Sequence, residues 1–144
     1  MDAEVTYNIG DAAVLKDWKI TISNMQIQDS IDSDYGTFKP NDEGNKYLLI
    51  SATAENTGKQ AGKFMPSVGF GDDVGTKLLF GDGYEFTATN LLGYSNDMHD
   101  STVNPLSSQS GEIAFEVPAS VSDSSDPIFI QFSSGNDFVK IRVR

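Results

Sequence analysis

Two segments of the sequence alternate apolar and polar residues, and they constrain the fold more than any other feature. Residues 18–22 carry an apolar side chain at every second position, and the alternation resumes on the opposite parity at Met25 and Ile27. Successive side chains of a strand point to opposite faces of a sheet, so a change of parity inside one strand indicates an extra residue, a β-bulge. We therefore predict one long, bent strand with a bulge near Ser23-Asn24.

The second segment, residues 47–55, gathers aliphatic and small side chains on one face. The residues that share this face are Leu48, Ile50, Ala52 and Ala54. The two alanines predict that another sheet approaches closely at this point. The segment stops at Asn56-Thr57-Gly58, where an asparagine side chain can bond the backbone two residues further on and end the strand. We assign Asn56 this structural role rather than a functional one.

Shorter strand patterns lie between clusters of Gly, Asn, Asp, Ser and Pro, at residues 67–71, 77–80, 112–117, 128–132 and 138–143. Turns are predicted at 71–75 and 81–83, and Pro118 ends the strand before it because proline cannot donate to a ladder. No long segment shows the 3.6-residue period of a helix. The chain is therefore predicted to be an all-β, antiparallel β-sandwich. The residues expected to be buried are Trp18, Ile20, Ile22, Leu48, Ile50, Phe115, Val117 and Ile141.

Composition restricts the class of protein. The chain has 144 residues, which suits one domain, and 10 Lys and Arg against 21 Asp and Glu give a formal net charge of -11. A surface this acidic repels a phosphate backbone, so we expect no nucleic-acid partner. The sequence contains no cysteine, which excludes disulfides, thiolate metal sites and thiol nucleophiles. No stretch approaches the roughly 18 consecutive apolar residues of a membrane-spanning helix.

Four segments together resemble a known family: residues 7–11, residues 46–58, residues 70–75, and the strand 111–118 that finishes in Phe-Glu-Val-Pro. The family is the Ig-like domain of unknown function of secreted proteins and lipoproteins of Gram-positive bacteria, in the immunoprotective extracellular superfamily. The resemblance implies a single Ig-like β-sandwich over residues 7–144, with residues 1–6 as the remainder of a linker behind a removed signal or anchor. It also implies an extracellular or cell-surface location, membrane contact only through a lipid anchor, and no catalytic residues or cofactors to carry over.

The most acidic stretch, residues 29–45, raises the question of a metal site. Its spacing does not fit an EF-hand, because Gly36 and Pro40 fall at positions 5 and 9 of the loop counted from Asp32. Two interpretations stay open: a solvated loop between two strands, which we favour, or a calcium site of another kind, since calcium accepts flexible oxygen ligands. The candidate calcium ligands are Asp29, Asp32, Asp34, Asp42 and Glu43.

Candidates for catalysis are few. His99 is the sole histidine, and its neighbours Asp97 and Asp100 normally point away from it on an extended segment. We expect a surface histidine whose replacement by alanine changes stability by no more than about 0.5 kcal/mol. Phosphate-binding, dinucleotide-binding and zinc-protease motifs are missing. We expect a non-enzyme, and the alternative is a secreted hydrolase that uses Asp and Glu carboxylates in a cleft.

Aromatic and aliphatic residues crowd a segment broken by glycine and asparagine, where they form either ordinary core or an exposed groove for a ligand. The candidate ligand-binding residues are Tyr84, Phe86, Leu91, Leu92 and Tyr94. The partner would be an unknown protein, a peptide or a cell-wall glycan. The function predicted from the sequence is therefore a non-catalytic extracellular or cell-surface module for ligand binding or adhesion.

The last strand pattern places Lys140, Arg142 and Arg144 on one face, opposite Val139, Ile141 and Val143. We interpret it as an edge strand whose basic residues discourage sheet-to-sheet aggregation. Docking to an acidic polymer such as teichoic acid is the alternative.

Overall fold

The computed structural model describes residues 6–33, 36–64, 75–81, 83–89 and 102–144. Almost all of the regular structure in these ranges is β-strand, and the helix α1 is a single turn at Ala119–Ser122. This helix is far too short and polar to cross a membrane, so the described residues contain no candidate membrane span. The strands are β1 (Thr6–Asn8), β2 (Ala12–Leu15), β3 (Trp18–Gln28), β4 (Ile31–Ser33), β5 (Gly36–Phe38), β6 (Lys46–Asn56), β7 (Gly62–Lys63), β8 (Gly75–Phe80), β9 (Tyr84–Thr87), β10 (Thr102–Val103), β11 (Ser108–Val117), β12 (Ile128–Ser134) and β13 (Asp137–Arg142).

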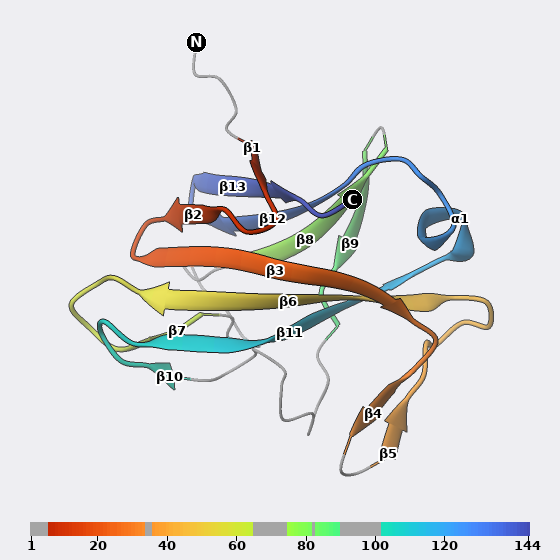
Figure 1. Cartoon of the computed structure of the whole chain (residues 1–144), viewed down its shortest axis with the longest axis horizontal. Coiled ribbons are helices and arrows are strands. Elements are labelled where there is room, and N and C mark those ends of the chain that lie inside the picture. The colour runs from red at the N-terminus through yellow and green to blue at the C-terminus, as the bar shows by residue number, and fades with distance from the viewer. Residues whose placement is uncertain (1–5, 34–35, 65–74, 82, 90–101) are drawn as a thin grey trace.

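Two sheets pack against each other (Figure 1). One is five-stranded in the order β1-β13-β12-β8-β9, and the other is four-stranded in the order β11-β6-β3-β2. Neighbouring strands are antiparallel except for β1 and β13, which are parallel. The predicted antiparallel β-sandwich is confirmed, and the short pairs β7–β10 and β4–β5 lie outside the two main sheets.

The long strands form as their alternation predicts. The register of β3 against β6 shifts between Ile22 and Asn24, so the expected bulge is present and Met25 returns to the core side. The core lies between the sheets, and its largest fully buried side chains include Phe64, Phe115 and Phe132. Every residue expected to be buried is buried except one.

Trp18 is half-buried rather than buried. It belongs to the last register pair of β2 and β3, at the end of the sheet, so the core covers one side of the indole. Its ring meets Phe64 edge to face at 5.2 Å between centroids. Phe64, which the sequence pattern did not single out, is the fully buried residue of this aromatic pair.

The turns follow the predicted chemistry where they are described. The Asn56 side chain accepts a hydrogen bond from the Gly58 N–H at 2.9 Å and donates to the carbonyl oxygens of Gln60 and Val103. This confirms its role in ending β6. The predicted turn at 81–83 joins β8 to β9, where Phe80 pairs with Tyr84. The predicted strand at 67–71, and the predicted turn before Gly75, lie outside the described residues.

The interpretation of the last strand as an edge strand is wrong. β13 is paired on both sides, with β12 along its length and with β1 from Lys140 to Arg142. β1 has three residues, and no strand pattern in the sequence predicts it. The expected alternation holds, because Val139 and Ile141 are buried while Arg142 is exposed.

The acidic stretch forms a hairpin rather than a plain loop. β4 and β5 pair from Ile31 opposite Phe38 to Ser33 opposite Gly36, and the hairpin extends from one end of the sandwich (Figure 1). Ile31 and Phe38 pack over the outer face of the four-stranded sheet at Tyr47 and at two neighbours, Leu49 and Ala114. These residues form a second, smaller hydrophobic core outside the sandwich.

Candidate functional site

The five-stranded sheet carries a hollow on the face that points away from the core. Its floor consists of outward-facing side chains from three neighbouring strands: Leu79 of β8, Phe129 and Gln131 of β12, and Lys140 of β13. Leu79 lies opposite Phe129 and Gln131 lies opposite Lys140 in the register, so the four form one patch. This sheet hollow has a volume of about 610 Å³, within the range of roughly 300 to 1,000 Å³ that small-molecule sites occupy.

The β8–β9 hairpin forms one wall of the sheet hollow. Gly81 and Gly83 have φ angles of 60° and 129°, in the left-handed region that other residues rarely adopt. They allow Tyr84 to follow Phe80 after a three-residue turn and to pair with it directly. Glu85 points outward beside Leu79, whereas Tyr84 lies on the same face of β9 as Phe86, at the end of the hairpin, and remains 65% exposed.

The opposite wall is the segment that enters β12, at Asp126 and Pro127. Arg144 holds this wall in place: its Nε donates to the carbonyl oxygen of Asp126 at 3.0 Å, and Nη1 donates to that of Ser122 at 3.3 Å. The guanidinium also lies 6.0 Å from the centre of the Phe80 ring. Burial lowers the pKa of Arg144, and the Asp126 carboxylate acts in the opposite direction. One side chain thus contacts both walls.

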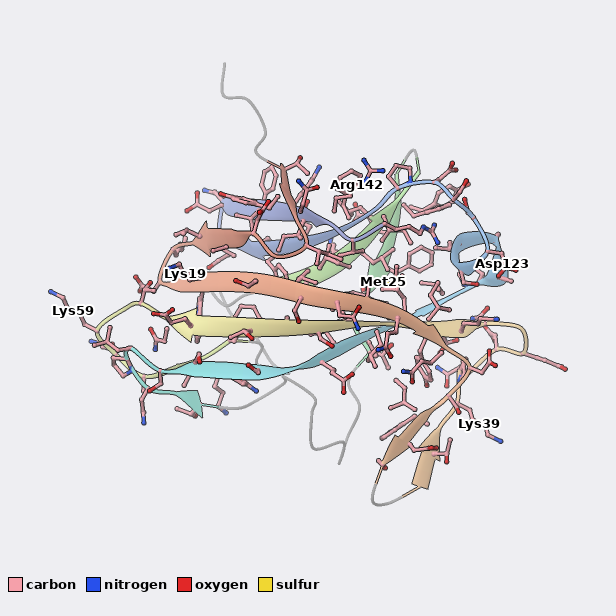
Figure 2. All side chains as sticks on the ribbon, viewed as in Figure 1. Lys19, Met25, Lys39, Lys59, Asp123 and Arg142 are labelled. Carbon is pink, nitrogen blue, oxygen red and sulfur yellow. The ribbon has the colours of Figure 1, made fainter. Side chains whose placement is uncertain are left out.

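Charges of both signs surround the sheet hollow. Lys77 and Glu85 form an ion pair of 3.0 Å in which both side chains are about half exposed, so the pair contributes little stability. Lys140 lies with its ammonium 5.7 Å from the Phe138 ring centre, and Asp126 supplies a second carboxylate. Arg142 lies beyond the hollow on the same face, at the top of the view in Figure 2.

A smaller, more apolar hollow adjoins the first and shares Phe80 and Tyr84 with it. It lies between β9 and the helix α1, where Phe86 faces Pro118 and Val121, and its volume is about 260 Å³. Tyr84 contributes to the lining of both hollows, and its side chain shares the face of Phe86, which lines the smaller one.

The structure brings part of the predicted ligand-binding segment to these hollows. Tyr84 lines both and half-buried Phe86 lines the smaller one. Leu91, Leu92 and Tyr94 lie outside the described residues. Sequence reasoning missed Gln131 and Phe129, although the alternation in 128–132 was a usable signal because it places both on the outward face of a strand.

The candidate calcium ligands that the structure describes are not gathered around one point. Asp29 forms an ion pair with Lys46 at 3.5 Å, and Asp32 accepts a hydrogen bond from the Thr37 hydroxyl at 3.0 Å. Asp42 and Glu43 lie in the turn before β6 and are exposed, and Asp34 lies outside the described residues. Within the described ranges, no three acidic, histidine or cysteine side chains are grouped as a metal site.

Glu116, which the sequence did not suggest as important, organises that turn. Its carboxylate accepts hydrogen bonds from the backbone N–H groups of Asn41 at 2.9 Å and Asp42 at 3.4 Å and from the Asn45 side chain at 2.9 Å. Partial burial raises the pKa of Glu116, but these hydrogen bonds outweigh it and lower the pKa overall. The same carboxylate adds to the effect of burial in raising the pKa of Tyr47.

The catalytic candidate His99, with Asp97 and Asp100, lies outside the described residues. Its expected surface position remains a prediction. In the sheet hollow, Glu85 and Asp126 are the carboxylates that line a common space.

Comparison with known proteins agrees with this architecture. Residues 7–137 match a family described as a domain of unknown function, DUF4352. The chain belongs to this family. A search of functionally curated proteins gives no match.

Solved structures with the same fold include three bacterial proteins. An uncharacterized β-sandwich protein from Clostridium difficile is 18% identical with a TM-score of 0.69, and the match covers 100% of this chain and 98% of that one. A conserved hypothetical protein from Bacillus anthracis is 11% identical with a TM-score of 0.68, covering 96% and 95%. The secreted protein MPT63 from Mycobacterium tuberculosis is 13% identical with a TM-score of 0.66, covering 99% and 98%. At these identities the likeness shows a shared β-sandwich fold.

Proposed function

We propose that this DUF4352 domain is a non-catalytic, ligand-binding module with Ig-like topology that works outside the cell or on its surface. Its ligand binds in the sheet hollow. The observation that carries the proposal is the composition of that hollow, where the apolar side chains of Leu79 and Phe129 are combined with a few polar and charged groups. This combination is typical of binding sites that orient a ligand without reacting with it.

The proposed location rests on two supports. The structural neighbour MPT63 is described as secreted, and the segments quoted above resemble domains of secreted proteins and lipoproteins of Gram-positive bacteria. We propose the same setting here, with a lipid anchor in the full-length protein and a cell-envelope component or an extracellular protein as partner.

A binding assay tests the proposal. The natural chain and the variant Tyr84→Ala are each labelled with a fluorophore and titrated against isolated Gram-positive cell envelopes. The matched control is Val14→Ala, because Val14 is also an exposed apolar residue, at 59%, but lies on the four-stranded sheet. We expect saturable binding that Tyr84→Ala weakens and Val14→Ala leaves unchanged. Saturable binding that is equally strong in both variants would place the ligand elsewhere, and lack of any binding would refute the proposal for envelopes.

The alternative, a hydrolase, is favoured by one observation, the shared position of Glu85 and Asp126 at the sheet hollow. The same envelopes provide its test, because a glycoside hydrolase would release reducing sugars at a rate that Glu85→Gln abolishes. We expect no release above that of a heat-inactivated sample. A rate that depends on Glu85 would replace the binding proposal with an enzymatic one.

A further inference from the structure

We infer that the outward face of the five-stranded sheet docks a linear, phosphate-bearing polymer of the cell envelope. This inference rests on the proposed function, which it extends by naming the class of ligand. Three features of the structure carry it: the placement of positive charge, the distance of that charge from the protein's carboxylates, and the hydrogen-bonding groups beside it.

The cations of this face, which together we call the basic face, are Lys77 of β8 and Lys140 and Arg142 of β13. Lys77 and Lys140 both lie opposite Gln131 in the strand between them, so their backbones are two strand spacings, or about 10 Å, apart. Arg142 follows Lys140 by two residues and shares its face, at about 7 Å along the strand. One polymer chain can therefore contact all three cations.

The two outer faces of the sandwich carry opposite charge. On the four-stranded sheet, the charged strand residues that face outward are Lys19, Glu55, Glu112 and Glu116. On the basic face, the carboxylate of Glu85 is engaged by Lys77 at 3.0 Å. Positive charge is thus concentrated on one side of a protein whose net charge is -11. Because β13 is paired along both edges, these cations are not needed to protect a free strand edge.

The net charge does not keep a polyanion from this face at physiological salt. Packed sheets lie about 10 Å apart, so carboxylates beyond the four-stranded sheet are more than one screening length away, which is about 8 Å under these conditions. At an ionic strength of about 0.01 M the screening length grows to about 30 Å, and repulsion by the whole protein then reaches the basic face. The affinity for a polyanion should therefore be highest at an intermediate salt concentration.

The groups on the basic face are mainly hydrogen-bond donors. Lysine and arginine side chains only donate, and the amide of Gln131 can both donate and accept. The Nε of Arg142 donates to the carbonyl oxygen of Arg144 at 3.0 Å, which holds the exposed guanidinium in place. A phosphodiester brings negative charge and acceptors but no donor, so it matches this set. An acidic peptide also brings backbone N–H donors that need acceptors, and Glu85 is already ion-paired.

The basic face overlaps the sheet hollow, because Gln131 and Lys140 belong to both. Beside them, Phe129 and Leu79 provide apolar surface, which a short carbon unit between two phosphates can cover. The carboxylate of Asp126 precedes β12 and lies toward the other end of the hollow, beside the turn that follows Phe80. A polymer that alternates phosphate with carbon units therefore uses both the cations and the apolar floor.

The test titrates an oligomer of glycerol phosphate into the ¹⁵N-labelled protein and follows the amide chemical shifts, with polyglutamate as the acidic peptide probe. We expect saturable binding of the phosphate oligomer, with the largest shifts at Lys77, Gln131 and Lys140. Binding should be about three-fold tighter at roughly 0.1 M salt than at roughly 0.01 M, and it should be lost at roughly 1 M. Polyglutamate should bind more weakly at each salt concentration.

Variants matched in charge separate the position of a cation from the net charge. Lys140→Gln combined with Arg142→Gln should weaken binding of the phosphate oligomer about ten-fold. The control combines Lys19→Gln with Lys59→Gln, which changes the net charge equally at exposed lysines away from the basic face (Figure 2). It should leave the affinity nearly unchanged, because the two lysines are screened from the ligand.

A gain of affinity provides a test that unfolding cannot imitate. Glu85→Gln removes the carboxylate that engages Lys77, so it should tighten binding of the phosphate oligomer about two-fold. Glu55→Gln, the matched control on the outer face of the four-stranded sheet, should not. Thermal unfolding of each variant verifies that it is folded.

Three results would overturn the inference. Equal losses of affinity in the two double variants would mean that net charge, and not the basic face, governs binding. Tighter binding of polyglutamate would assign the face to an acidic peptide. The third result is a phosphate oligomer that neither binds nor displaces the protein from envelopes. If envelopes still bind in a Tyr84-dependent manner in that case, the ligand class is wrong and the proposed function stands; if envelopes also fail to bind, both are wrong.

Discussion

The outer faces of the two sheets are used differently, although both sheets contribute to one core. On the four-stranded sheet, β6 and β11 present mainly serine, threonine and glutamate outward, and the β4–β5 hairpin covers the large apolar residues Tyr47 and Leu49 of β6 to 3% and 4% exposure. Val14 of β2, on the same sheet, stays 59% exposed. The five-stranded sheet carries Leu79 and Phe129 in equivalent outward positions, and these line an open hollow instead.

This difference separates apolar surface that the chain covers by itself from apolar surface that it leaves open. Ile31 and Phe38 pack over the outward-facing apolar residues of β6. No ligand is therefore needed to explain why apolar residues occur there. The hollow on the five-stranded sheet combines apolar and polar side chains in an open surface. Exposed apolar surface of this kind more often marks an interaction site than a defect.

The largest expected effect comes from the core that both faces share. Phe115→Ala removes a fully buried ring and should lower the free energy of unfolding by about 3 to 5 kcal/mol. Urea denaturation followed by circular dichroism measures it. A loss of less than about 1 kcal/mol would mean that the two faces do not depend on a common core.

A smaller effect is expected where the hairpin covers the four-stranded sheet. Ile31→Ala should cost about 2 kcal/mol, at the low end for buried isoleucine, because the cavity lies under a hairpin that can move inward. Lys39 directly follows β5 and is exposed (Figure 2), so Lys39→Ala serves as the control. It should change the free energy of unfolding by no more than about 0.5 kcal/mol. The amide shifts of Gln131 and Tyr84 should be unchanged in both. Shifts at Gln131 in Ile31→Ala would show that the faces are coupled.

The turn held by Glu116 should make stability depend on pH in a defined direction. Its pKa is lower in the folded protein than the value of about 4.3 for an unfolded glutamate, so its contribution is present above that value and is lost as the pH falls through the folded pKa. Glu116→Gln should therefore be less stable than the natural chain at pH 7, by less than Ile31→Ala, and the difference should shrink below about pH 4.3. A difference that grows on acidification would contradict the assigned hydrogen bonds.

The smallest effect is expected from calcium on the acidic hairpin. A typical extracellular calcium site would stabilise the fold by about 1.4 to 2.7 kcal/mol in 10 mM calcium. We expect calcium and magnesium at equal concentration to shift the melting temperature alike, because the candidate ligands are engaged separately and diffuse screening depends on ionic charge alone. A calcium-selective rise that disappears in Asp32→Asn would make the hairpin a metal site.

What the sequence predicts well here is set by local periodicity. The bulge in β3 follows from a parity change between Ile22 and Met25, and the end of β6 follows from the hydrogen-bonding chemistry of Asn56. Tyr84 was a candidate because it lies in an aromatic-rich segment broken by glycine and asparagine, and it is 65% exposed. Each of these depends on residues that are neighbours in the chain.

What the sequence does not predict depends on register between distant strands. The floor of the sheet hollow exists because Leu79 lies opposite Phe129 and Gln131 opposite Lys140, pairings that no local pattern fixes. The β4–β5 hairpin was missed because Ile31 and Phe38 stand isolated among polar residues and bury their side chains only against another sheet. The role of Arg144 likewise appears only when the segment at Asp126 is placed beside it.

The parallel pairing of β1 with β13 determines how the domain bears tension. Thr6 lies opposite Lys140 and Asn8 opposite Arg142, so both strands run the same way along their seam. A force that pulls residue 6 and residue 142 apart acts along the strands in opposite senses. It loads the bonds of the seam in shear, all at once, whereas the same force on an antiparallel hairpin would peel the bonds one after another. The pairing of β1 with β13 thus resists a force that pulls along the two strands.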